Sequence, residues 1–196
     1  MDYNNDGKKD LILGEGAGFI RIYINTNTDA NPVFGTVAYV QVGSVNKDFG
    51  DYSAPYLVDW DNDGKRDLLC GDNTGNVSLL INTGTNSNPA YTSSVKIYSG
   101  SVLIDVGSRS APVVFDWDDD GKKDLLVGTA SGQIWFYTNV GTDSAPVFDG
   151  YVNLEVNGAP LDCGANTCFD MCDWTNDGMA DLMVGSENIT GSPMGP

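Results

Sequence analysis

One acidic motif recurs at a fixed spacing, and this spacing constrains the fold more than any other feature of the chain. In its complete form the motif reads Asp-x-Asp-x-Asp-Gly-x-x-Asp, and an apolar run follows it. Its four copies begin at Asp2, Asp59, Asp116 and Asp173, each 57 residues after the one before. A period without insertions indicates one structural unit that is used repeatedly.

The motif has the composition of a calcium-binding loop. Oxygen-bearing side chains stand at loop positions 1, 3, 5 and 9, and position 6 is always glycine. Carboxylates at this density repel one another unless a cation lies among them. A hard ion that takes about six to eight oxygen ligands fits calcium better than magnesium or zinc. The glycine permits the turn that wraps the chain around the ion, which leaves the carbonyl of position 7 pointing inward.

We therefore predict four calcium sites, three strong and a fourth weaker. Position 7 contributes its backbone carbonyl and the other positions contribute side chains. The predicted ligands are Asp2, Asn4, Asp6, Lys8 and Asp10 in the first loop; Asp59, Asp61, Asp63, Lys65 and Asp67 in the second; Asp116, Asp118, Asp120, Lys122 and Asp124 in the third; and Asp173, Thr175, Asp177, Met179 and Asp181 in the fourth. The fourth is weaker because Thr175 offers only a hydroxyl or a water-mediated contact.

Other calcium motifs with the same opening do not fit. An EF-hand needs an acidic ligand at position 12 and an amphipathic helix on each side. Position 12 is Leu13, Cys70, Val127 or Val184, each inside an apolar run that ends in glycine. A dockerin-like pair fails for the same lack of helices. The run after each loop, as in Leu-Leu-x-Gly, indicates a buried strand instead.

Residues 53–110 show the plan of one unit. An apolar strand at 53–59 enters the loop, a second at 68–71 leaves it, a third lies at 77–81, and a more variable fourth lies at 95–98. Short strands rich in Val, Ile and aromatic residues, separated by Gly, Asn and Pro, indicate an all-β protein. Four antiparallel strands per unit is the blade of a β-propeller. The expected units are about 1–52, 53–109, 110–166 and an incomplete 167–196.

These features resemble FG-GAP/VCBS repeats, the blade type of integrin α-subunit propellers and of many secreted bacterial proteins. The resemblance rests on the loops, on the Leu-Leu-x-Gly strands, and on the phased elements Ser53-Ala54-Pro55 and Ser110-Ala111-Pro112. It covers nearly the whole chain. It implies that each loop joins the first two strands of a blade and holds calcium at the rim, and that the protein is secreted or lies at the cell surface.

The chain has too few repeats to close a propeller ring. The chain of 196 residues holds about three and a quarter units, whereas closed propellers usually have about four to eight blades. We expect a fragment of a larger propeller. The alternative is that the open blade edges pair with other copies of the chain, because open strand edges attract pairing.

The composition of the chain excludes some classes of function. The net charge of −17 argues against nucleic acid, whose binding needs basic surface, and no apolar run is long enough for a transmembrane segment. We expect a calcium-stabilised binding or structural module for a protein or glycan ligand, or for self-assembly. The alternatives are the propeller portion of a lyase-like, polysaccharide-active enzyme and a lectin. We expect no enzyme, because the chain has no histidine for nucleophile activation and its conspicuous carboxylates are assigned to metal.

Three further features allow more than one interpretation. The basic pairs at loop positions 7 and 8, replaced by Met179-Ala180 in the fourth loop, either offset the loop charge or contact an acidic ligand. In the second case the apolar fourth loop would lie against a partner. The aromatic residues at position 2 are expected to pack between blades rather than form a sugar-stacking row. Cys163 and Cys168 flank a turn and could form a local disulfide.

Overall fold

The computed structural model describes residues 1–187, and in this range the chain forms strands and turns without a helix. All paired strands are antiparallel. The all-β fold predicted from the strand pattern is therefore confirmed. Residues 188–196, the end of the expected fourth unit, lie outside the described residues.

Two blades have all four strands, and in each the strands pair in chain order. The second blade contains β6 (Ala54–Val58), β7 (Asp67–Gly71), β8 (Val77–Leu80) and β9 (Val95–Lys96). The third blade contains β12 (Ala111–Phe115), β13 (Asp124–Gly128), β14 (Ile134–Tyr137) and β15 (Val152–Asn153). Their registers correspond, since Leu57 faces Leu68 in one and Val114 faces Leu125 in the other.

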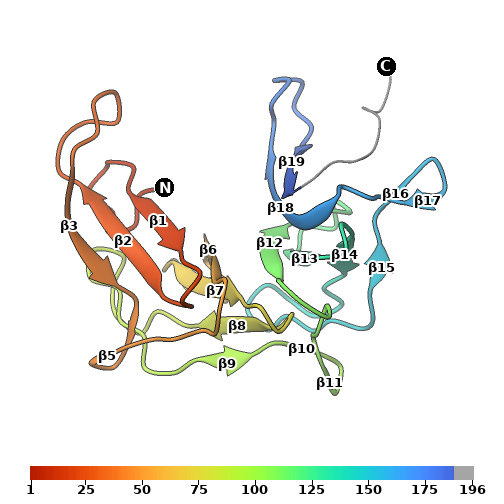
Figure 1. Ribbon diagram of the computed structural model, residues 1–196, viewed down its shortest axis with the longest axis horizontal. Coiled ribbons are helices and arrows are strands. Elements are labelled where there is room, and N and C mark those ends of the chain that lie inside the picture. Colours follow the sequence, from red (N-terminus) through yellow and green to blue (C-terminus); the bar gives the residue numbers. More distant parts are fainter. Residues whose placement is uncertain (188–196) are drawn as a thin grey trace.

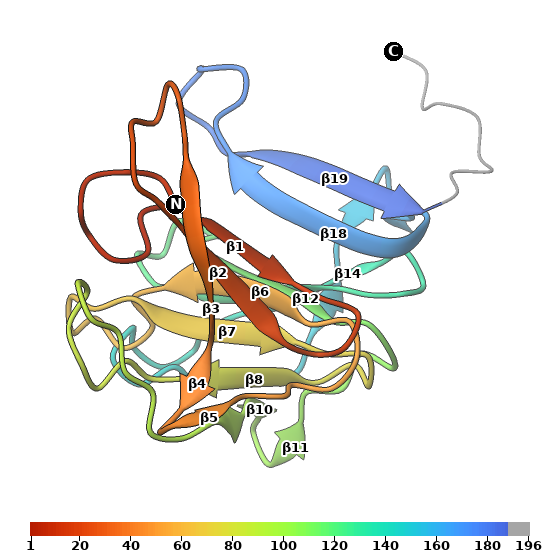
Figure 2. The ribbon, with the colours of Figure 1, turned by 60° about the vertical axis from the view of Figure 1, so that its left-hand side comes forward.

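At the two ends of the described range, 1–187, the strands form partial blades. The first blade contains β1 (Leu11–Gly14), β2 (Ile20–Asn25) and β3 (Phe34–Tyr39), which correspond to strands two to four of a full blade. The hairpin of β18 (Ala165–Cys172) and β19 (Asp181–Glu187) corresponds to strands one and two. The sheets follow one another in an open arc, with β12 next to both β6 and β18 (Figures 1 and 2).

A short two-stranded ribbon follows the fourth strand of each of the first three blades, and the sequence analysis did not predict it. The ribbons pair β4 (Gln41–Val42) with β5 (Val45–Asn46), β10 (Tyr98–Ser99) with β11 (Val102–Leu103), and β16 (Glu155–Val156) with β17 (Ala159–Pro160). In the last, Asn157 and Gly158 both have positive φ, the signature of a tight hairpin. The first two ribbons join blades, because Gly43 and Gly100 donate to the carbonyls of Tyr91 and Phe148.

The hydrophobic core lies between successive blades rather than within any one of them. One cluster joins residues of blades one and two, such as Ile22 and Leu68, and a second joins blades two and three, such as Leu69 and Leu125. A third joins blade three to the terminal hairpin. The strands β7 and β13 are buried along their whole length because both of their faces meet a neighbouring blade. This explains their continuous apolar sequence.

The position-2 aromatic residues fall into two groups. Trp60 is buried in the core between blades two and three, and Tyr3 packs against the core between blades one and two. Trp117 is 37% exposed and Trp174 is 72% exposed. Packing between blades therefore holds for the first two only.

Cys70 is a buried core residue as expected, and all four cysteines are free thiols in the structure.

The glycine that ends each Leu-Leu-x-Gly strand marks the closest approach of two blades. A Cβ at Gly71 would overlap the backbone carbonyl of Ser110, where the third blade begins. Ser110 Oγ donates to the carbonyl of Asn76 at 2.6 Å and accepts from Asp72 N at 2.9 Å, so the contact cannot widen without loss of buried hydrogen bonds. Gly14 and Gly128 meet Ser53 and Thr167 in the same way.

Gly71→Ala is expected to lower the free energy of unfolding by about 2–3 kcal/mol, because overpacking of a fixed contact forces the blades apart. Gly16→Ala is the matched control. A Cβ at Gly16 meets no atom within 4 Å, so its effect should stay within about 0.5 kcal/mol. Urea unfolding of the two variants measures the difference, and equal stabilities would show that the glycine contact does not hold the blades together.

Candidate metal centre

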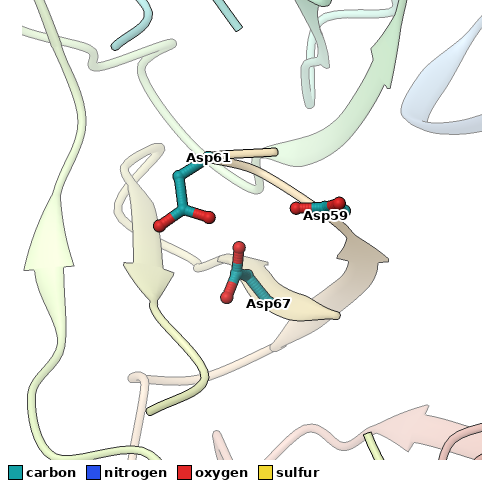
Figure 3. Close-up of side chains that lie close together, drawn as sticks. All are labelled: Asp59, Asp61 and Asp67. Carbon is teal, nitrogen blue, oxygen red and sulfur yellow. The ribbon is translucent and has the colours of Figure 1, made fainter. Parts of the chain in front are cut away.

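The four acidic loops lie where the resemblance places them. The second, third and fourth loops connect the first strand of a blade to the second, from β6 to β7, β12 to β13 and β18 to β19; the first loop precedes β1. In the second loop the carboxylates of Asp59, Asp61 and Asp67 point toward one another (Figure 3). The structure therefore brings together side chains that the motif distributes over nine residues of sequence.

The position-1 aspartate shapes each loop. Asp59 Oδ1 accepts a hydrogen bond from Asp63 N at 3.1 Å, and its Oδ2 accepts one from Gly64 N at 3.0 Å. The same pair of bonds occurs in the other three loops. The glycine at position 6 has a φ of 83° to 88° in the four loops, and position 4, for example Asn62, also lies in the left-handed region. This backbone conformation favours glycine, so it confirms the predicted reason for glycine at position 6.

The position-9 aspartate has a structural role that the motif does not reveal. Asp67 is fully buried, and its two oxygens accept from Trp60 N at 2.9 Å and from Asn82 N at 2.7 Å. It therefore ties the start of the loop to the end of the third strand. Asp10 and Asp124 make the equivalent bonds, with distances between 2.7 and 3.0 Å.

Burial raises the pKa of Asp67. The two backbone amides that it accepts from lower the pKa, while the charges of Asp61 and Asp63 raise it further. The pKa of Asp124 is raised for the same reason, again mainly by burial. A buried carboxylate among other carboxylates is an unfavourable arrangement unless positive charge is nearby.

Two loops bring together enough carboxylates to hold one ion. Asp59, Asp61 and Asp67 each offer an oxygen, and these oxygens all lie within 4.8 Å of one another; Asp116, Asp118 and Asp120 form the same kind of group in the third loop. Oxygens bound about 2.3–2.6 Å from a calcium ion lie at most about 5 Å apart. The donor set consists of hard oxygens, so the geometry and the chemistry both fit calcium. At position 3 the first loop has Asn4, whose amide oxygen is also a calcium ligand, whereas the fourth loop has Thr175, which offers only a hydroxyl.

The position-7 lysines pair with their own loops. Lys65 Nζ lies 2.7 Å from Asp63 Oδ2 and Lys122 Nζ lies 2.6 Å from Asp120 Oδ2. The hydrogen bond lowers the pKa of each aspartate and raises the pKa of each lysine. Both pairs are about one-third exposed, so their contribution to stability is small. Their position agrees with the interpretation that these lysines offset loop charge.

A set of side chains that the sequence analysis did not identify braces position 8 of the loops. The Oδ1 atoms of Asp29, Asn86 and Asp143 accept from the backbone N of Lys9, Arg66 and Lys123 at 2.6, 2.8 and 2.7 Å. These three residues come from the turn after the third strand of the same blade. They are also spaced by 57 residues, so the period contained the signal that would have found them.

Two position-8 side chains connect the loops of neighbouring blades, and we call Arg66 and Lys123 the tethers. Arg66 Nη1 donates to the carbonyl of Asp2, the first residue of the preceding loop. Lys123 Nζ donates to the carbonyl of Asp59 and, at 3.3 Å, to Asn62 Oδ1. These basic residues are therefore engaged within the chain at two junctions between loops.

A family model described as an FG-GAP-like repeat matches residues 2–70 and again residues 59–127. The two matches together cover more than half of the chain, and each spans two successive acidic loops with the strands between them. No curated protein and no solved structure matches the chain significantly.

Acidification is expected to change the stability of the calcium-depleted and the calcium-loaded protein in opposite directions. Because the pKa values of Asp67 and Asp124 are raised above 3.8 in the fold, the folded chain binds these protons more tightly than the unfolded chain. Without calcium, stability should therefore rise as the pH falls through the raised pKa values toward 3.8. With calcium, protons compete with the ion for the carboxylates, and stability should fall.

Melting temperatures between neutral pH and pH 4, measured with and without calcium, test this prediction. The aspartates with lowered pKa, Asp63, Asp72 and Asp120, lose their stabilising effect mainly below 3.8, so most of this effect is still present at pH 4. The same direction of change in both conditions would contradict it.

Proposed function

The chain belongs to the FG-GAP-like repeat family, and on this premise we propose that it is a calcium-stabilised β-propeller module that binds a protein or glycan partner outside the cell. Repeats of this family build β-propeller-type binding and structural modules. Calcium, the extracellular location and the partner are the parts that we add to this assignment.

The observation that carries the proposal is the convergence of three carboxylates in both complete blades, each set within 4.8 Å. Each set includes a carboxylate hydrogen-bonded to the loop backbone, so the oxygens are held in place before an ion arrives. The remaining cost is electrostatic repulsion, which a divalent cation removes. Calcium would then fix each loop against the strands on either side of it.

The expected size of the effect is substantial for a chain of this length. Extracellular calcium sites bind at roughly 10⁻⁴–10⁻³ M. At about 1 mM calcium, a site with a dissociation constant of about 10⁻⁴ M contributes about 1.4 kcal/mol. Three strong sites and a weaker fourth together approach the net stability of a typical domain, about 5–15 kcal/mol. Calcium in this proposal is structural rather than catalytic.

A location outside the cell is supported by the family, whose repeats are typical of extracellular and surface proteins. Between residues 1 and 187 the structure has no helix that could cross a membrane. The millimolar calcium found outside cells also suits loops of this affinity class.

We propose that the chain is not itself an enzyme. In the acidic loops the aspartates of positions 1 and 9 accept backbone hydrogen bonds, which suits a structural role better than proton transfer. Turnover of an acidic polysaccharide that is lost on substitution of an acidic residue or a lysine outside the loops would favour a lyase instead. Calcium-dependent binding on a glycan array would favour a lectin.

Removal of calcium is expected to lower the melting temperature by many degrees, and titration calorimetry should show three strong sites and one weaker site. Asp61→Asn should weaken calcium binding at the second loop and reduce the calcium-dependent part of the melting shift. It should spare the fold, since asparagine occupies the same position naturally in the first loop, at Asn4.

Glu155→Gln is the matched control for Asp61→Asn, because it removes one exposed negative charge from strand β16 of a ribbon rather than from an acidic loop. It should leave calcium affinity unchanged. A melting temperature that does not respond to excess chelator would rule out structural calcium, and an equal loss of affinity in both variants would show that only net charge matters.

A further inference from the structure

The junction between the third and fourth loops lacks the tether that joins the earlier loops. At the first two junctions a cation at position 8 donates to the first carbonyl of the preceding loop, Arg66 to Asp2 and Lys123 to Asp59. In the fourth loop this position is Ala180, which has no side-chain donor. The acceptor that corresponds to the Asp2 and Asp59 carbonyls is the Asp116 carbonyl. No hydrogen bond within residues 1–187 reaches it.

A cavity of about 340 Å³ lies at this untethered junction. The residues around it that matter here are Phe115, Trp117, Asp119, Met171, Met179 and Ala180. Its walls are polar and apolar in about equal parts, and Asp119 is the one charged residue among those that line it. Trp117 and Met179 are both exposed, so the cavity is accessible from the surface.

The acceptors at this junction are better suited to a cation than those at the tethered junction. Lys123 Nζ reaches the Asp59 carbonyl and the side-chain oxygen of Asn62, which is loop position 4. In the third loop position 4 is Asp119, whereas the other three loops have asparagine there. A carboxylate accepts a hydrogen bond from an ammonium or guanidinium more strongly than an amide does.

We propose that this junction is a binding slot for a lysine or arginine side chain of a partner protein. The partner's charged group takes the place of the missing tether, donating to the Asp116 carbonyl and the Asp119 carboxylate. Its aliphatic stem lies against Met171 and Met179, since long basic side chains bury their stems on apolar surface and keep the charged group in a polar environment. The chain's net charge of −17 favours the approach of a basic partner.

The chain itself supplies the template for this recognition, because the two tethers show the same loop acceptors engaged by basic side chains. An apolar side chain would fill the cavity but leave Asp119 without a counter-charge. The inference deepens the binding role proposed above and rests on it. Its two acceptors, the Asp116 carbonyl and the Asp119 carboxylate at position 4, are not predicted calcium-binding groups, and Met179 contributes its side chain to the slot but only its backbone carbonyl to the predicted fourth calcium site.

The test uses two small probes, N-acetyl-lysine methylamide and N-acetyl-norleucine methylamide, which share the stem and differ in the ammonium group. Binding is followed by the amide and indole NMR signals of Ala180 and Trp117 in calcium-containing buffer. The lysine probe should shift these signals saturably and bind about tenfold more tightly than the norleucine probe, the factor expected for a hydrogen bond to a charged group.

Ala180→Lys should fill the slot from within the chain and weaken binding of the lysine probe about tenfold. Ala30→Lys is the matched control, because it makes the same change on an exposed loop of the first blade. Asp119→Asn should weaken binding about threefold. It keeps the loop intact whatever happens to the first variant, since asparagine holds this position in the other three loops.

Equal binding of the two probes would overturn the proposal in favour of an apolar slot, and no saturable shift would remove the site altogether. Unchanged affinity in Ala180→Lys and Asp119→Asn would show that the lysine probe binds elsewhere. A calcium titration of the same samples separates this outcome from failure of the proposed function: intact calcium binding without lysine binding overturns the slot alone.

Discussion

The contact between successive blades is the constraint on which the rest of the structure depends. A single blade has two apolar faces and cannot bury either of them alone, so its strands become stable only when a neighbour lies on each side. The clusters around Leu68, Leu69 and Leu126 are all built from two adjacent units. The glycine at the end of the second strand is required because the next blade begins against its backbone.

The acidic loops depend on this packing and in turn reinforce it. Buried Asp67 links its loop to the end of the third strand, and Asn86 braces the loop from the following turn. The tethers then connect the second and third loops to the loops before them. Negative charge is thus concentrated at points that backbone amides and lysines reach, and where the proposed cation would lie. A loop without its tether, as at Ala180, leaves the junction open to something outside the chain.

Periodicity in the sequence was sufficient for the fold class and for the position of the loops, but it did not reveal how the loops are held. Asp29, Asn86 and Asp143 have the same spacing as the motif, yet their side-chain type is not diagnostic on its own. The ribbons after the fourth strands were missed because each strand has only two residues, too few for an alternating pattern. The aromatic residue at position 2 was assigned one environment, whereas Trp60 is buried and Trp174 is exposed.

By itself the sequence determined the repeating all-β unit, the turn made by glycine at loop position 6, and the oxygen-rich character of the loops. Those properties are local, since they follow from side-chain chemistry and backbone conformation within about ten residues. Only the tertiary structure decided which loops converge on three close carboxylates, where Arg66 and Lys123 reach, and which junction stays open. Those outcomes depend on how one blade lies against the next, and residues more than sixty positions apart in the chain meet only there.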